Sequence, residues 1–160
     1  MRTLGNAALA LALTAAAATA DAGIKASAIL PGTNGVASPA EYFVPLNGAG
    51  ATTLNFNLSS AGKKVLTYSA LCAVQAPPGD ATAFLDLDIY VNGVVVAPTV
   101  GNRDAFCSAS GTGGLDGWVR ASITVPIQGI AGTNTVSIKA RGTFNATWLF
   151  LSDAALLILD

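Results

Sequence analysis

Apolar and polar side chains alternate along several stretches of this sequence, and this alternation constrains the fold more than any other feature. The clearest stretches are residues 54–58, 66–74, 84–91, 119–127 and 136–141. Successive side chains of a β-strand point to opposite faces, so a strand with one buried face has this period of two. Glycine, asparagine and proline separate the stretches, and Asn92-Gly93 is typical of a two-residue hairpin turn. The sequence therefore predicts an all-β protein.

The predicted strands are short and number about eight to ten, which favours a sandwich of two antiparallel sheets. An immunoglobulin-like sandwich would place a tryptophan between the two cysteines, whereas Trp118 and Trp148 both follow Cys107. We therefore predict a jelly-roll β-sandwich. Pro126 predicts a sheet edge or a bulge, because proline lacks the N–H that a strand ladder needs. The last segment, 146–160, is apolar at most positions and predicts a strand covered on both faces.

The first 22 residues have a different character. Arg2 is followed by an apolar, alanine-rich run, and small residues follow at Ala18, Ala20 and Ala22. This order is typical of a secretory signal peptide, and a retained membrane anchor is the weaker alternative because the run is short and alanine is weakly hydrophobic. We expect residues 1–22 to be the signal peptide of a bacterial protein and 23–160 to be one β-sandwich domain. The expected location is secreted, periplasmic or cell-surface, with no stable membrane span.

Two cysteines, Cys72 and Cys107, occur in this exported chain and most simply form one disulfide. Cys107 lies in the glycine-rich stretch 104–118, "DAFCSASGTGGLDGW". A phosphate-binding loop would have a lysine after its glycines and a helix behind it, and neither is found here. We predict a surface loop held by the disulfide. The alternative is that Asp104 and Asp116 bind calcium, although the dense ladder of acidic residues typical of calcium loops is missing.

The charge content is low, with eight basic and nine acidic residues and a net charge of −1. A near-neutral chain without a basic cluster has no electrostatic surface for nucleic acid or an anionic membrane. A monomer with so few surface charges tends to associate. We therefore expect a homo-oligomer.

Acidic and aromatic residues share one face of the predicted strand 84–91 if the aliphatic residues between them face the core. We expect this face to be solvated, and the alternative is a binding stripe for a sugar or a protein. Glycosidase chemistry needs two carboxylates across a substrate cleft, which one strand face does not provide. Together with the loop aspartates, the candidate ligand or partner surface comprises Phe84, Asp86, Asp88, Tyr90, Asp104 and Asp116.

The sequence contains no histidine, which excludes a Ser-His-Asp triad and removes the commonest nitrogen ligand of metal sites. We therefore predict no catalytic residues and no cofactor, with calcium as the open alternative. Trp118, Trp148 and Phe150 are interpreted as core or subunit-interface residues, because buried aromatics dominate such cores. A ligand platform is the other interpretation.

The order of segments from residue 50 to 160 resembles the tumour-necrosis-factor and complement-globular-head superfamily. The resemblance rests on turns at Ala61-Gly62 and Ala131-Gly132 and on a closing strand at 150–157. The sequence departs from the family pattern at Thr133, where aspartate is frequent, and at Ser152-Asp153, where the family has glycine. The resemblance implies a ten-strand jelly roll, often trimeric, that binds partners and does not catalyse reactions.

We therefore expect a non-catalytic exported protein that acts in binding or surface assembly, as a homo-oligomer. One alternative is a carbohydrate-binding module that uses the candidate surface around Tyr90. Another is an extracellular filament subunit in which the strand 24–30 is exchanged into a neighbouring copy by β-augmentation.

Overall fold

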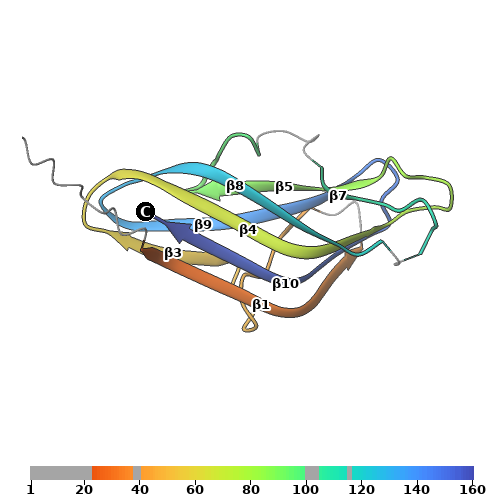
Figure 1. The fold of residues 1–160 in the computed structure, drawn as a ribbon, viewed down its shortest axis with the longest axis horizontal. Helices are drawn as coiled ribbons and strands as arrows, with labels where there is room; N and C mark the ends of the chain where they lie inside the picture. Colours follow the sequence, from red (N-terminus) through yellow and green to blue (C-terminus); the bar gives the residue numbers. More distant parts are fainter. Residues whose placement is uncertain (1–22, 38–40, 100–104, 115–116) are drawn as a thin grey trace, which may run out of the picture.

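The computed structural model describes residues 23–37, 41–99, 105–114 and 117–160 (Figure 1). Residues 1–22, which the sequence predicts as a signal peptide, lie outside the described residues. Among the residues that are described, no helix is long and apolar enough to span a bilayer. The strands are β1 (Ile24–Ala37), β2 (Tyr42–Phe43), β3 (Thr53–Leu58), β4 (Gly62–Gln75), β5 (Phe84–Val91), β6 (Val94–Val95), β7 (Ala105–Ser108), β8 (Val119–Gly129), β9 (Gly132–Thr143) and β10 (Trp148–Leu159).

The strands form two sheets whose neighbouring strands are antiparallel. One sheet has four strands in the order β1-β10-β4-β8, and the other has six, in the order β2-β9-β5-β6, with β3 also paired to β9 and β7 to β5. Figure 1 shows the long strands running side by side from one end of the molecule to the other. The predicted all-β jelly-roll sandwich is confirmed, and so is the predicted number of strands.

The core lies between the two sheets and is built from every second residue of the long strands. In β4 the inward side chains include Leu66 and Tyr68, and in β10 they include Leu149, Leu151 and Ile158, all of which are buried. The opposite side chains of β10 face outwards, and the exposed Trp148 is among them. The prediction that the last strand is covered on both faces is therefore wrong for its outer face, because the described residues form only one layer over β10, on its inner side.

Two local predictions are confirmed by the backbone. Asn92 and Gly93 have positive φ angles of 51° and 79°, as a two-residue hairpin between β5 and β6 requires. Pro126 lies in β8, which is an edge strand of the four-stranded sheet. Its missing N–H therefore interrupts no ladder between two central strands.

The predicted disulfide is also confirmed. Cys72 of β4 is bonded to Cys107 of β7, with a Cα–Cα distance of 6.4 Å. The bond joins the two sheets through the core, because both residues are buried. The glycine-rich loop that follows β7 lies against the β4–β5 loop, where Gly79 N donates to Gly111 O at 2.8 Å.

The N-terminal strand has its partner within the same chain. β1 pairs with β10 from Ile24 opposite Leu159 to Ala37 opposite Trp148. The segment 24–30, considered above for exchange into a neighbour, is thus one half of an edge strand of the four-stranded sheet.

Candidate functional site

Two of the four aspartates of the predicted ligand surface, Asp86 and Asp88, are buried. Asp86 is 1% exposed and Asp88 is 7% exposed, so the prediction of a solvated strand face is wrong at these two positions. The reason is the position of β5 inside the six-stranded sheet, where β9 lies alongside it. The register places Arg141 opposite Asp86 and Lys139 opposite Asp88, and the Arg141 guanidinium lies against both carboxylates.

Arg141 holds both carboxylates. Its Nε and Nη2 atoms lie 2.7 Å and 2.6 Å from Asp86 Oδ2, and Nη2 lies 3.6 Å from Asp88 Oδ2. A guanidinium that contacts a carboxylate through two nitrogens forms a strong, geometrically defined pair. The carboxylates therefore belong to a charge network within the sheet, and their geometry is not that of two acids facing each other across a cleft.

The aromatic residues at the two ends of the same strand are half-buried. The ring of Phe84 packs edge-on against Phe144, with 5.7 Å between centroids. The ammonium of Lys139 lies 5.4 Å from the centroid of Tyr90 and 5.2 Å from that of Phe43. A hydrogen bond from Lys139 to Glu41 raises the pKa of the lysine above its usual value. Contact of Phe84 or Tyr90 with a ligand stays a prediction.

The remaining two residues of the predicted surface, Asp104 and Asp116, lie outside the described residues. Within the described ranges, no three acidic or cysteine side chains gather in a way that could hold a metal ion.

Three aromatic side chains come together on the outer face of the four-stranded sheet. Trp148 and Phe150 are two positions apart in β10, and Trp118 immediately precedes β8. The Phe150 centroid lies 5.9 Å from that of Trp148, with 22° between the planes, and 6.1 Å from that of Trp118, with 58° between the planes. We call these three residues the aromatic platform.

The platform is accessible to solvent. Trp118 is 38% exposed and Trp148 is 43% exposed. Core positions for these two tryptophans are thereby excluded, which corrects one of the two interpretations drawn from the sequence. A subunit interface and a ligand platform remain as alternatives for them.

Small residues on the neighbouring strands make room for the Phe150 ring. Phe150 pairs with Gly35 of β1 on one side and with Ala73 of β4 on the other. A Cβ atom at Gly35 would lie 2.7 Å from Phe150 Cε1, so the ring lies directly over this glycine. The register of three strands therefore brings together the three residues for which the sequence left a ligand platform open as the second interpretation.

Polar groups lie next to the platform. Arg120 follows Trp118 by two positions and is exposed, so both side chains are on the same face of β8. Thr33 and Ser152 pair two positions along the same strands from Gly35 and Phe150, and Thr33 Oγ1 donates to Ser152 Oγ at 3.2 Å. The outer face thus offers apolar rings beside the exposed residues Arg120 and Thr33, while Ser152 is buried.

The fold is similar to that of several solved structures at low identity. A family 35 carbohydrate-binding module from Clostridium thermocellum is 17% identical, with a TM-score of 0.37 over 82% of this chain and 97% of that chain. A module of the same family from Paenibacillus barcinonensis is also 17% identical, with a TM-score of 0.37 over 83% and 97%. Dimeric latent PorU from Porphyromonas gingivalis is 14% identical, with a TM-score of 0.38 over 83% of this chain and 12% of its own. No protein-family model and no curated relative matches the chain. These likenesses concern the fold alone, so function is inferred from this chain's own residues.

Proposed function

We propose that this protein is a non-catalytic carbohydrate-binding module that stacks sugar rings on the aromatic platform. The observation that carries the proposal is the exposure of Trp118 and Trp148, whose rings both pack against Phe150. Large aromatic side chains are normally buried, and a gathered group of them at the surface marks a binding site.

The chemistry of a pyranose matches this surface. One face of the ring presents mainly C–H groups, which pack on the flat, electron-rich face of an indole or phenyl ring. The hydroxyl groups at the rim of the sugar need hydrogen-bonding partners, and the exposed residues Arg120 and Thr33 lie beside the rings. Because the site is an open sheet face, we expect weak binding of a single sugar ring, with a Kd of roughly 0.1–1 mM.

The absence of catalysis is part of the proposal. The acidic pair Asp86 and Asp88 lies on the other sheet, where Arg141 holds both carboxylates. This arrangement supports a role in the folded sheet and gives no acid–base pair next to the platform. Export is likewise proposed, and the disulfide between Cys72 and Cys107 supports it because such bonds persist in oxidising compartments.

The test is a panel of neutral polysaccharides and oligosaccharides measured against the mature protein by isothermal titration calorimetry. Trp118→Ala and Trp148→Ala should each weaken binding at least tenfold. Phe43→Ala is the matched control, because Phe43 is an exposed aromatic residue of the other sheet and its loss should leave the affinity unchanged. Absence of any bound glycan would overturn the proposal, and loss of binding in Tyr90→Ala alone would move the site to the six-stranded sheet.

Assembly through the same face is the second candidate. Ile24 and Ile29 of β1 are 65% and 64% exposed, and Val65 of β4 is also exposed. Ile29 and Val65 pair with outward-facing positions of β10, so the face is apolar beyond the platform as well. Two such faces could pack as a second sheet layer about 10 Å away. This candidate includes the predicted homo-oligomer, and the trimer implied by the tumour-necrosis-factor resemblance stays a prediction.

Sedimentation equilibrium separates the two candidates. Assembly predicts an oligomer at micromolar concentration that Ile29→Lys converts to a monomer. A monomeric wild-type protein that binds glycan would leave only the first candidate.

A further inference from the structure

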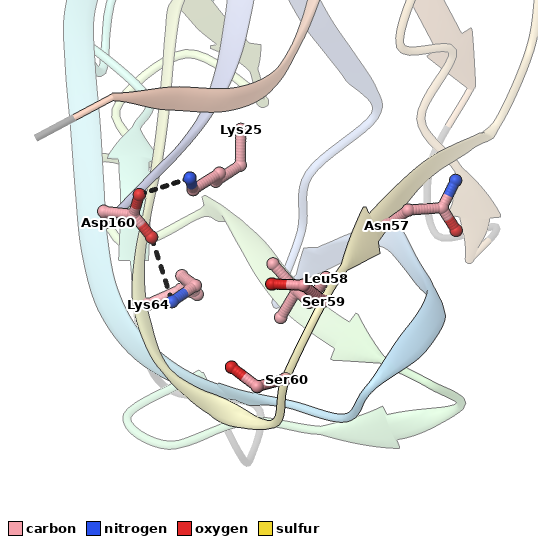
Figure 2. A pocket seen from close by; sticks show the side chains of 7 residues that line it. All are labelled: Lys25, Asn57, Leu58, Ser59, Ser60, Lys64 and Asp160. Carbon is pink, nitrogen blue, oxygen red and sulfur yellow. Dashed lines mark ion pairs between the residues drawn. The ribbon is translucent and has the colours of Figure 1, made fainter.

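A polar hollow lies at the end of the sandwich far from the aromatic platform. It is found where β1 begins, β10 ends and the chain turns from β3 into β4, and its volume is about 400 Å³. Figure 2 shows its lining, which comprises Lys25, Asn57, Leu58, Ser59, Ser60, Lys64 and Asp160.

The lining carries more positive than negative charge. The ammonium of Lys25 lies 2.5 Å from Asp160 Oδ2, and that of Lys64 lies 3.0 Å from Asp160 Oδ1. Hydrogen bonds from Lys25 and Lys64 hold the pKa of the Asp160 carboxyl below its usual value, so this group is ionised at neutral pH. Among the side chains that line the hollow, two carry an ammonium group and one carries a carboxylate, so these side chains together have a net charge of +1.

The hollow also presents more hydrogen-bond donors than Asp160 can use. Each ammonium has three N–H groups, and its ion pair with Asp160 engages one of them. Figure 2 shows the hydroxyl oxygens of Ser59 and Ser60 on the side of the hollow that faces Lys64. Several N–H and O–H donors therefore converge on one space.

We propose that this hollow binds an oxyanionic group, a carboxylate, sulfate or phosphate, between the lysine ammonium groups and the serine hydroxyls. An anion with several oxygen atoms accepts charge-assisted hydrogen bonds from the ammonium groups and further bonds from the hydroxyls. Asp160 acts as the built-in counter-charge that holds Lys25 and Lys64 in place before the ligand arrives, and it limits the affinity by repelling the anion. The site goes beyond the proposed sugar platform and is independent of it.

The experiment is an NMR titration of the ¹⁵N-labelled mature protein with sodium sulfate, sodium phosphate and sodium glucuronate at constant ionic strength. Sodium chloride serves as the compensating salt, so that general screening is held fixed. The readout is a saturable shift of the backbone amides of Ser59, Ser60 and Lys64. Saturation by glucuronate alone would identify a uronic acid as the source of the group, and saturation by sulfate or phosphate would identify a tetrahedral anion.

Matched variants make the result specific. Lys64→Gln and Ser60→Ala should each weaken the affinity for the anion at least fivefold. If Lys64→Gln does not fold, Ser60→Ala still tests the site. Lys63→Gln is the control, because Lys63 is the neighbouring residue and does not line the hollow. Asp160→Asn should tighten binding severalfold, since it removes the repelling carboxylate.

The proposal is overturned by a linear response to all three anions, or by equal losses in Lys63→Gln and Lys64→Gln, since either indicates screening alone. Unchanged or weaker binding in Asp160→Asn would contradict the proposal that Asp160 limits the affinity by repelling the anion. Trp148→Ala should leave the titration unchanged, so failure here and failure of the sugar proposal are distinguishable.

Discussion

Asp86 of β5 and Arg141 of β9 lie directly opposite each other, and the Arg141 Nε atom donates to Asp86 Oδ2 at 2.7 Å. The carboxylate is almost fully buried, while the guanidinium reaches the surface. Taking a carboxylate out of water is costly unless a hydrogen-bonded partner of opposite charge compensates it. The pair therefore explains how an acidic residue is accommodated in the middle of this sheet.

We expect Arg141→Gln to lower the free energy of unfolding by about 2–4 kcal/mol, because it removes the cation from a buried carboxylate. Urea denaturation measures this loss. Lys139→Gln is the comparison, since Lys139 pairs with the exposed Glu41 at 3.2 Å and such surface pairs contribute less than about 1 kcal/mol. Equal, small losses in both variants would show that the Asp86 contact adds little to stability.

Asn134 connects two turns at the end of the sandwich that holds the polar hollow. Its Oδ1 atom accepts from the backbone N–H of Ile130 at 2.8 Å and from Asn92 Nδ2 at 3.0 Å, and its Nδ2 atom donates to the carbonyls of Ile130 and Gly132. The side chain is fully buried. All of its hydrogen-bonding groups thus have partners inside the protein.

Replacing this buried side chain breaks four hydrogen bonds at once, all of them partly buried. Asn134→Ala should therefore lower the free energy of unfolding by about 2–4 kcal/mol, measured by thermal denaturation followed by circular dichroism. Asn57→Ala is the control, because Asn57 is exposed and accepts one hydrogen bond from Thr133. A loss in Asn134→Ala no larger than that of the control would contradict this account.

Much of the fold follows from local features of the sequence. The aliphatic residues Leu85, Leu87 and Ile89 are buried between the sheets, as the period of two predicts. Asn92-Gly93 forms its turn because both residues tolerate positive φ. The cysteine pair could be predicted because only one intramolecular pairing exists.

The candidate sites could be predicted only in part, since they depend on register between distant strands. Trp118, Trp148 and Phe150 could be named as a possible ligand platform, but their contact with one another could not be predicted. Arg141 covers Asp86 from 55 positions away, and alternation within 84–91 carries no trace of that partner. The platform needs Gly35 and Ala73 beside Phe150, and the hollow unites residues from both ends of the described chain. The pairing between distant segments decides which polar or aromatic side chains meet. The alternation within a single strand does not predict that pairing.

Asp80 should make the loops at the platform end of the sandwich sensitive to acid. Its carboxylate accepts from the backbone and hydroxyl of Thr82 at 2.8 Å and 2.6 Å and from Asn145 Nδ2 at 2.8 Å. The hydrogen bond from the Thr82 hydroxyl is the main cause that lowers the pKa of Asp80 to about 2 from a usual 3.8. The ionised form is thus favoured in the folded protein.

A carboxyl group with a lowered pKa stabilises the folded state fully above its usual pKa and loses this effect as the pH falls to the folded value. The link from Asp80 to Thr82 and Asn145 should therefore persist at pH 5 and weaken between about pH 4 and pH 2. The side-chain amide signals of Asn145, followed by NMR, report it. In Asp80→Asn this pH dependence should disappear, and an Asp80 titration midpoint near 4 would contradict the assignment.

Gly35 should control the aromatic platform without taking part in it. A Cβ atom there would lie within 2.8 Å of two atoms of the Phe150 ring, so Gly35→Ala must tilt that ring away from β1. Because the Phe150 ring stacks on Trp148 and makes a tilted contact with Trp118, we expect glycan binding to weaken about threefold to tenfold and the tryptophan fluorescence to shift. Gly48→Ala is the matched control, since its added Cβ would meet Pro31 only at an ordinary contact distance of 3.7 Å. Equal affinity in Gly35→Ala and the wild type, with both proteins folded, would mean that the position of Phe150 does not matter for binding.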